Sequence, residues 1–328
     1  MSMGFEEIDY MYELAENLYF VQGDGRGLFP HCNGYLLTGE ETVLIDTGIG
    51  KGKIREIDEK GRIDVVIITH SHPDHFLNWD LLEDRHLLLP QQTPNAAQDL
   101  ELLGQRLAGT LEGGARWVEV FGRGLGLLPL REPDGRFADG DLLKVGSAEL
   151  EAIHAPGHLD DHYCFFDRKS GTLITTDIDF SSFGPWYCNP EADIELFQAT
   201  VERIMALPYS RTCSSHKKPI EGRAIGEFEA FMAGFDRHKR TVLELCHPST
   251  TVEEITAMSP FFKGRLPDKM IQRTFEGNMI KKILALLVRD GAVEESEGPL
   301  ENLWVQSPIF PFNHLISHNK TSKYCCFF

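Results

Sequence analysis

The chain has 328 residues, 42% of them hydrophobic and 25% charged, which is enough for one large buried core and a smaller appended one. Its formal net charge of -18 argues against a long polyanion as ligand unless basic side chains gather on one face. The first residues lack the basic and apolar regions of a signal peptide, and no apolar stretch reaches the roughly 18 residues of a membrane span. Seven cysteines, scattered without CxxC pairs, are typical of reduced thiols and favour a cytoplasmic protein.

Strand-like runs dominate the first part of the chain. The segment YELAENLYFVQGD ends in a predicted strand, GYLLTGEETVLIDTG predicts a hairpin, and IDVVIITH predicts a buried strand. Pro73 then starts a predicted helix through PDHFLNWDLLED. Between Gln91 and Asp139 the pattern weakens, with one predicted helix in QDLELLGQRLAGTLEGG and then a loop or weak strand.

Strands return in DLLKVGSAELEAIHAPGH and HYCFFDRKSGTLITTD, followed by a helix in ELFQATVERIMALP and a short strand in RTCSSH. This alternation predicts an α/β fold. The acidity is concentrated early: residues 1–220 carry 19 basic and 36 acidic groups, and 221–328 carry 13 and 14. We therefore expect a first domain at 1–222, a helical domain at 223–298 and a loosely ordered tail at 299–328. The helices are expected in IGEFEAFMAGFDRHKRTVLELC, TVEEITAMS and MIKKILALLVRDGAV.

The motif HSHPDH supplies four candidate metal ligands. In an extended segment His70 and His72 point to the same side, whereas Pro73 turns the chain and sends Asp74 and His75 in another direction. Ligands that diverge in this way suit two ions better than one. Imidazole and carboxylate without cysteine favour zinc, with iron or manganese as alternatives. Further candidate ligands follow strand-like runs: His158, Asp177 and His216.

The other histidines and three acidic residues are expected either at the surface or in support of the ligands. We assign His86, His238, His247, His314 and His318 to the surface. His31 and His154 stay undecided, as does His162, which is also a candidate to support a ligand. Asp46, Asp160 and Asp161 are candidates to orient ligand imidazoles through hydrogen bonds.

THSHPDH resembles the signature of the metallo-β-lactamase fold, and the resemblance continues through LIDTG, APGH, LITTD and SSH over residues from about 12 to 220. It implies a four-layer αββα sandwich. On the family pattern His70, His72 and His158 hold a first metal, Asp74, His75 and His216 hold a second, and Asp177 bridges them. One departure is Ser215, where the family often has glycine.

The resemblance implies a hydrolase in which a metal-bridging hydroxide attacks a carbonyl or phosphoryl centre, with Asp74 as the catalytic residue that orients it and moves a proton. Asp177 favours the glyoxalase-II-like, lactonase-like and nuclease-like branches over true β-lactamases. A histidine at position 72 argues against oxygen-reducing di-iron relatives, which resemble this pattern but carry glutamate there. We expect Phe183, Trp186 and Tyr187 to line the substrate pocket, and Trp117, Phe121 and Phe137 to line its entrance.

Two substrate classes remain open. The acidic first domain favours a small-molecule thioester, lactone or related ester as substrate. The alternative is an RNA or DNA phosphodiesterase, because PGHLDDHYCFF and the C-terminal helices are similar to a branch that includes a mitochondrial endoribonuclease, in which a winged-helix-like region follows the sandwich. Its basic face would need Lys217, Lys218, Arg237, Lys239 and Arg240. A metal-binding protein without turnover is a third class, and a homo-oligomer is left open.

Overall fold

Two β-sheets stack face to face in the computed structural model, which describes residues 8–247, 250–297 and 302–306. The first sheet runs in the order β1 to β7, antiparallel up to β4 and parallel from β4 to β7. Its strands are β1 (Met11–Ala15), β2 (Leu18–Val21), β3 (Gly34–Thr38), β4 (Thr42–Ile45), β5 (Val65–Ile67), β6 (His86–Pro90) and β7 (Gly135–Phe137).

The second sheet has six strands in the order β13-β12-β11-β10-β9-β8. Only the β11–β12 pair in this sheet is parallel. The strands are β8 (Leu142–Val145), β9 (Ala148–His154), β10 (Tyr163–Asp167), β11 (Thr172–Thr176), β12 (Arg211–Ser214) and β13 (Ile220–Glu221).

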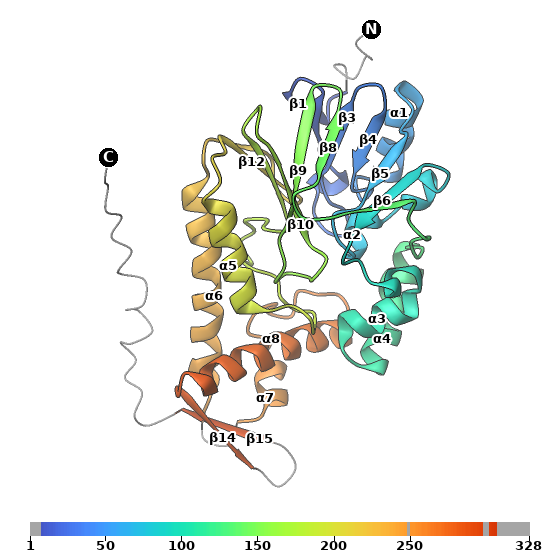
Figure 1. The fold of residues 1–328 in the computed structure, drawn as a ribbon. Helices are drawn as coiled ribbons and strands as arrows, with labels where there is room; N and C mark the ends of the chain where they lie inside the picture. Colours follow the sequence, from blue (N-terminus) through green and yellow to red (C-terminus); the bar gives the residue numbers. More distant parts are fainter. Residues whose placement is uncertain (1–7, 248–249, 298–301, 307–328) are drawn as a thin grey trace, which may run out of the picture.

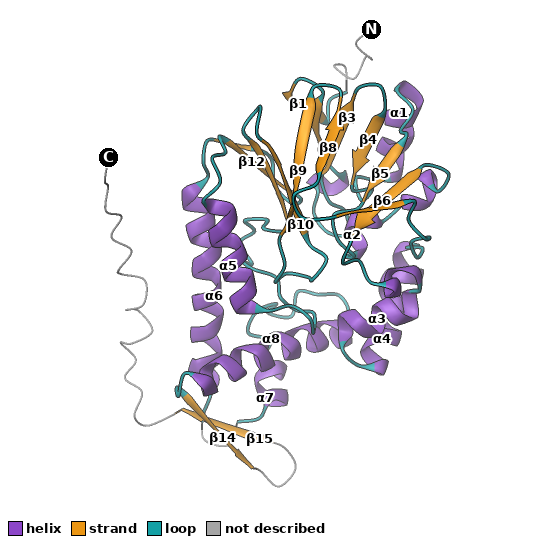
Figure 2. Cartoon of the chain, viewed as in Figure 1, coloured by secondary structure: helices purple, strands orange, loops and turns teal. Residues whose placement is uncertain are grey.

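Alternation along the strands divides the core into an inner layer and two outer ones. Val43 and Ile45 join the inner core between the sheets, whereas Leu44 belongs to the outer core that the helices cover. Helix α1 (Lys51–Lys60) covers the first sheet, and α5 (Ile194–Met205) and α6 (Ile225–Leu245) lie on the side of the second (Figures 1 and 2). This is the four-layer αββα sandwich that the sequence predicts.

Local backbone chemistry shortens two predicted helices. Helix α2 (Pro73–Phe76) is a single turn, since Asn78 adopts a left-handed conformation (φ 70°) before the 3-10 turn η3 (Trp79–Leu82). The single helix predicted from Gln98 consists of two helices, α3 (Leu100–Ala108) and α4 (Leu111–Trp117), because Gly109 (φ 83°) ends the first. The turn η4 (Asn95–Gln98) precedes them, and a π-helical turn, η5 (Val118–Arg123), follows.

The C-terminal region is helical, as predicted, and continues into a hairpin. Its helices after α6 are α7 (Val252–Ala257) and α8 (Lys269–Arg289), and α8 begins ten residues before the predicted start at Met279. Helix α8 crosses the base of the molecule between α6 and α4 (Figure 1). Strand β14 (Val293–Glu297) pairs with β15 (Asn302–Gln306), so part of the expected tail is a strand. The rest of that tail, including His314 and His318, lies outside the described residues.

The expected separation into domains at residue 222 stays a prediction. No helix among the described residues is both long enough and apolar enough to cross a membrane.

His238 on α6 is not at the surface, which corrects the prediction. It is 5% exposed, and its Nδ1 lies 2.9 Å from the Tyr187 hydroxyl and its Nε2 3.2 Å from the Phe183 carbonyl oxygen. The carbonyl can only accept, so Nε2 carries the proton and Nδ1 accepts from Tyr187. Burial, reinforced by the positive charge of Arg237, lowers the pKa of His238 to about 4.

This burial predicts a pH dependence of stability. In the unfolded chain the pKa of His238 is about 6.5. Burial of the neutral ring therefore contributes its full stabilisation above that pH, and this contribution is lost as the pH falls toward 4. In chelator, we expect the difference in unfolding free energy between wild type and His238→Gln to fall by up to about 3 kcal/mol between pH 7 and pH 4. Urea denaturation measures it. A difference for His238→Gln that does not change with pH would contradict the prediction.

Candidate metal centre

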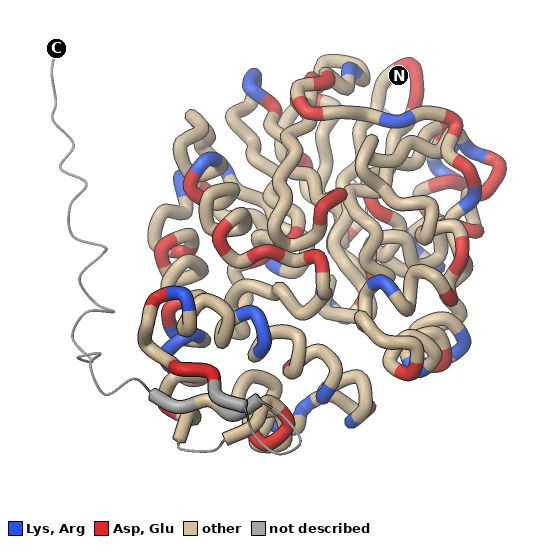
Figure 3. Tube along the Cα trace, turned by 60° about the horizontal axis from the view of Figure 1, so that its bottom comes forward, with Lys and Arg blue, Asp and Glu red and all other residues tan. Residues whose placement is uncertain are grey.

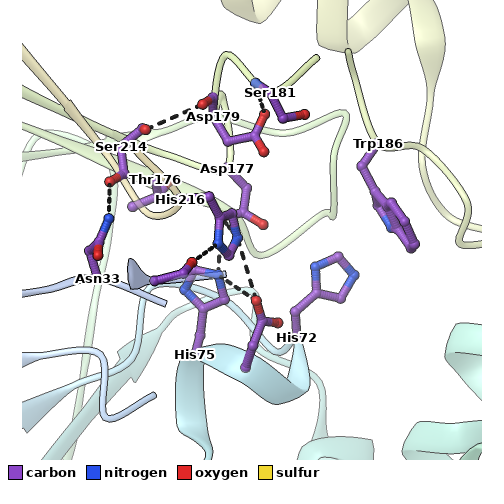
Figure 4. A network of polar contacts seen from close by, with 12 residues as sticks. Asn33, His72, His75, Thr176, Asp177, Asp179, Ser181, Trp186, Ser214 and His216 are labelled. Atoms are coloured by element: carbon purple, nitrogen blue, oxygen red, sulfur yellow. Dashed lines mark hydrogen bonds and ion pairs between the residues drawn. The ribbon is translucent and has the colours of Figure 1, made fainter. Parts of the chain in front are cut away.

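The structure brings all seven sequence-predicted ligand side chains together at one edge of the stacked sheets, and Figure 4 labels His72, His75, Asp177 and His216. They lie in the segments that follow β5, β9, β11 and β12, with Asp74 and His75 in the short helix α2. The segments are far apart in the sequence and meet because these strand ends share one edge of the sandwich. The residues are His70, His72, Asp74, His75, His158, Asp177 and His216.

Three imidazoles form a first set. His72 Nδ1 lies 3.2 Å from His70 Nε2 and 2.9 Å from His158 Nε2. Asp177 Oδ2 faces the same point, 3.6 Å from His70 Nε2 and 3.4 Å from His158 Nε2. All four side chains are buried, so water is largely excluded from this point.

The second set shares Asp177 with the first. Asp177 Oδ1 lies 3.0 Å from His75 Nε2 and 3.6 Å from His216 Nε2. Asp74 Oδ2 completes the set, 3.5 Å from His216 Nε2 and 3.9 Å from His75 Nε2. One carboxylate therefore presents one oxygen to each set, which is the arrangement of a bridging ligand.

Each histidine has its other ring nitrogen tied to a fixed partner. The partners are Thr69 Oγ1 for His70 (3.1 Å), Asn189 Oδ1 for His72 (2.6 Å), Asp46 Oδ2 for His75 (2.7 Å), the Trp186 carbonyl for His158 (2.9 Å) and the Gly27 carbonyl for His216 (2.7 Å). Carbonyl and carboxylate oxygens accept, so the facing nitrogen carries the proton. The Thr69 hydroxyl donates to Asp46 Oδ2 and so accepts from His70. In the first set the remaining nitrogens, which meet at the centre, therefore carry lone pairs.

This arrangement fits cations. Lone pairs that face one another at 2.9 to 3.2 Å repel unless a positive charge lies between them. Two nitrogens bound at about 2.05 Å to a tetrahedral zinc would lie about 3.3 Å apart, close to these separations. His75 Nε2 and Asp177 Oδ1 are also buried without a hydrogen-bond partner. Imidazole and carboxylate donors suit zinc, and iron and manganese accept the same donors.

The electrostatics of the two sets differ. Burial lowers the pKa of His70 and of His72 well below the usual range, reinforced by neighbouring imidazoles. Burial also opposes protonation of His216, yet Asp177 and Asp74 outweigh it and raise its pKa to about 10. His70 and His72 are therefore neutral imidazoles, and the second set holds the negative charge that a second cation would offset.

The IDTG motif explains how the second set is held. Asp46, in a left-handed conformation (φ 61°), accepts from the Thr69 backbone N–H at 2.9 Å as well as from His75. The Thr47 N–H donates to the His75 carbonyl oxygen at 2.9 Å. A Cβ on Gly48 would lie 1.6 Å from the Asp74 carbonyl oxygen, so only glycine fits there. Asp46 thus orients His75, as the sequence suggests.

Residues 27–216 match the family model described as the metallo-beta-lactamase superfamily, a segment that contains all seven of these side chains. The chain belongs to this superfamily. It is 25% identical over 286 residues to an atrochrysone carboxyl ACP thioesterase from Aspergillus fumigatus, covering 80% of this chain and 77% of that protein. It is 26% identical over 166 residues to an uncharacterized protein from Aquifex aeolicus, covering 50% of this chain and 72% of that one.

A solved structure is similar over most of the chain. The metallo-beta-lactamase family protein from Thermus thermophilus superposes with a TM-score of 0.69 at 20% identity, covering 90% of this chain and 100% of that one. Since residues 1–222 are only about two thirds of the chain, the shared fold includes part of the C-terminal helical region.

His162 lies behind the centre of this superfamily member and is not placed as a ligand. Its Nδ1 donates to the Ala155 carbonyl at 2.7 Å, and its Nε2 accepts from the Asp177 N–H at 3.2 Å and lies 2.6 Å from the Thr176 hydroxyl. Burial lowers its pKa to about 3, which keeps the ring neutral. It therefore supports the Asp177 backbone. Asp160, expected to orient an imidazole, pairs with Arg106 instead, and Asp161 is fully buried.

The aromatic residues divide into pocket candidates and core. Trp186 and Phe183 are partly buried, and the Trp186 carbonyl accepts from His158. Tyr187 is fully buried and stacks on Phe235, so its expected pocket role is wrong. The same correction applies to the entrance residues Trp117 and Phe137, which belong to the cores. Phe121 is buried against the exposed ring of Phe29.

Five groups bind the ring nitrogens that point away from the centre, and the sequence identified only Asp46 among them. The Gly27 and Trp186 partners are backbone carbonyls, which every residue has, so no residue type marks them. Thr69 and Asn189 are common residues without a distinctive pattern.

Asp46→Asn tests the support of the second set. The change keeps the shape of the side chain and removes the charge that faces His75, so we expect one of two metal ions to bind about 10–100-fold more weakly. Chelator competition with elemental analysis measures this. Asp58→Asn, on α1 away from the centre, is the control. Unchanged affinity for both ions in Asp46→Asn would contradict the assignment.

Proposed function

We propose that this protein is a dinuclear metal-dependent hydrolase of a small-molecule thioester, lactone or related ester. The observation that carries the proposal is the pair of ligand sets joined by the two oxygens of Asp177. Bound there, two cations would lower the pKa of a shared water toward neutrality and polarise a substrate carbonyl oxygen. Zinc is the first candidate, with iron or manganese as alternatives.

Asp74 is the residue we assign to proton movement. Its Oδ2 faces His75 and His216, which leaves Oδ1 to hold a proton of the attacking water and later pass it to the leaving group. Burial raises the pKa of the Asp74 carboxyl above its usual value, which makes it a better proton acceptor at neutral pH.

The rings of Phe183, Trp186, Phe262 and Phe275 form an apolar wall, which is joined to the first set through the Trp186 carbonyl and favours an acyl or aromatic substrate group. The Trp186 ring contacts Phe262 and Phe275 at centroid distances of 5.5 and 5.4 Å, and Phe183 stacks on Phe262 at 5.1 Å. Aromatic side chains that are partly exposed next to reactive groups are typical of small-molecule sites. A relative named as an acyl carrier protein thioesterase supports the same class of reaction.

Four of the five basic residues that nucleic-acid binding would need make other contacts. Lys217 lies 3.7 Å from Glu227, Lys218 lies over the Tyr12 ring, Arg237 donates to the Phe183 carbonyl, and Lys239 pairs with Asp290. In Figure 3 the Lys and Arg segments are scattered among Asp and Glu segments. With a net charge of -18, this distribution gives little attraction for a phosphate backbone.

Asp74→Asn tests the proposed reaction. We expect the wild type to hydrolyse members of a panel of thioesters, lactones and aryl esters, to lose this activity in chelator, and to regain it with added metal. In Asp74→Asn, kcat should fall about 10²–10⁴-fold, since the proton acceptor is lost. Metal content is measured in parallel because Asp74 is also a candidate ligand.

Asp80→Asn, a few residues further along the same segment, is the matched control and should retain full activity. If the metal-loaded wild type hydrolyses none of the panel but cleaves single-stranded RNA, the phosphodiesterase alternative replaces this proposal. If it holds two ions and turns over neither class, the protein is not a hydrolase of these substrates.

A further inference from the structure

Residues 186–190, between β11 and α5, support two of the three histidines of the first set. The Trp186 carbonyl accepts from His158 Nδ1 at 2.9 Å, and Asn189 Oδ1 accepts from His72 Nε2 at 2.6 Å. We call these five residues the support segment. Both bonds hold a ring so that its other nitrogen faces the centre.

The Asn189 amide has only one workable orientation. Its Nδ2 donates to the Leu107 carbonyl of α3 at 2.9 Å, and a carbonyl cannot donate in return. Oδ1 must therefore face His72, so His72 Nε2 carries the proton and Nδ1 carries the lone pair. His72 is the one histidine of the centre that presents Nδ1 inward, and Asn189 is what fixes this.

The C-terminal helices hold the support segment in place. Lys282 on α8 donates to the carbonyl oxygens of Asn189 and Pro190 at 2.8 and 3.0 Å, and Asn278, one turn earlier, donates to that of Cys188 at 2.9 Å. The Tyr187 hydroxyl donates to His238 on α6. Every residue of the segment except Trp186 is therefore tied to α6 or α8 by a hydrogen bond, and the Trp186 ring packs on Phe275 of α8.

Among the described residues, the partners that orient the imidazoles of the second set do not lie in the support segment or in the C-terminal helices. These imidazoles are oriented by Asp46, at the end of β4, and by the Gly27 carbonyl, next to the 3-10 turn η2 (Asp24–Arg26). Both supports belong to the first sheet and its loops. The two sets thus rest on different parts of the fold.

We infer that Asn189 is a positioning residue for His72, and that α8, through Lys282, holds it there, so that the C-terminal helices determine the affinity of the first metal site. This inference rests on the proposed dinuclear centre. It extends the proposal by separating the two sites: changes in the support segment or α8 weaken the first site, whereas changes at Asp46 weaken the second.

Two substitutions at position 189 separate positioning from packing. Asn189→Leu keeps the volume but has no acceptor for His72, so binding of one Co²⁺ should weaken about 10–100-fold. Asn189→Asp keeps an acceptor for His72 but sets a carboxylate oxygen against the Leu107 carbonyl. It should lower the melting temperature of the metal-free protein yet retain Co²⁺ affinity near that of wild type. The readouts are Co²⁺ titration against a competing chelator, the visible Co²⁺ spectrum, and thermal unfolding in chelator.

A lysine pair on α8 tests the link to the C-terminal helices. Lys282→Met should weaken the same single Co²⁺ site, by less than Asn189→Leu because the Asn189 side chain is still present. Lys281→Met, at the adjacent exposed position, should leave both sites unchanged. Asp46→Asn should weaken the other site, and in Asn189→Leu/Asp46→Asn both should be weak.

The outcomes distinguish a failure of the inference from a failure of the proposed dinuclear centre. If the wild type binds fewer than two Co²⁺ ions, the dinuclear centre itself is wrong. If it binds two, and Asn189→Leu binds both with wild-type affinity, the positioning role is wrong. If Asn189→Asp loses as much Co²⁺ affinity as Asn189→Leu, and both losses follow the fall in melting temperature, the residue acts only through packing and the inference fails.

Discussion

Imidazole lone pairs converging on one buried point are the constraint on which the rest of the structure depends. His70, His72 and His158 direct unprotonated nitrogens at one another within hydrogen-bond distance, and no proton remains to be shared between them. Without a cation this arrangement would be repulsive, so the surrounding fold must hold the rings in place. Left-handed backbone at Asp46 and Thr176, next to the two ligand sets, is strain that the packed sheets offset.

The candidate ligands were predictable because their chemistry limits the choice of residue. Only a few side chains bind a divalent cation, and at strand ends His158, Asp177 and His216 stand out as those few types. The geometry that makes them work was not predictable in the same way. A backbone carbonyl such as that of Trp186 has no residue signature, and Asn189 acts through an amide orientation that depends on Leu107, 82 positions earlier.

The layered fold followed from strand alternation and helix periodicity, whereas the errors lie where tertiary contacts override pattern. The start of α8 was missed because Gln272 and Glu276 are polar yet almost fully buried. They accept hydrogen bonds from the backbone N–H groups of Leu266, Phe261 and Phe262, which turns polar positions into interior ones. Tyr187 and His238 satisfy each other inside the protein, so neither polarity nor aromatic character marks where they lie.

In the proposed hydrolase, the position of the support segment would tie substrate preference to metal affinity. Trp186 contributes its ring to the apolar wall and its carbonyl to His158, so the same residue serves both. A change at Phe262 that lets the ring shift, made to admit a larger acyl group, also moves the carbonyl that orients a ligand. The supports of the second set, Asp46 and the Gly27 carbonyl, lie in a different part of the fold. In the proposed hydrolase, the side chains that pack around Trp186 would therefore act on both the substrate and the first ligand set, and those around Asp46 on the second set.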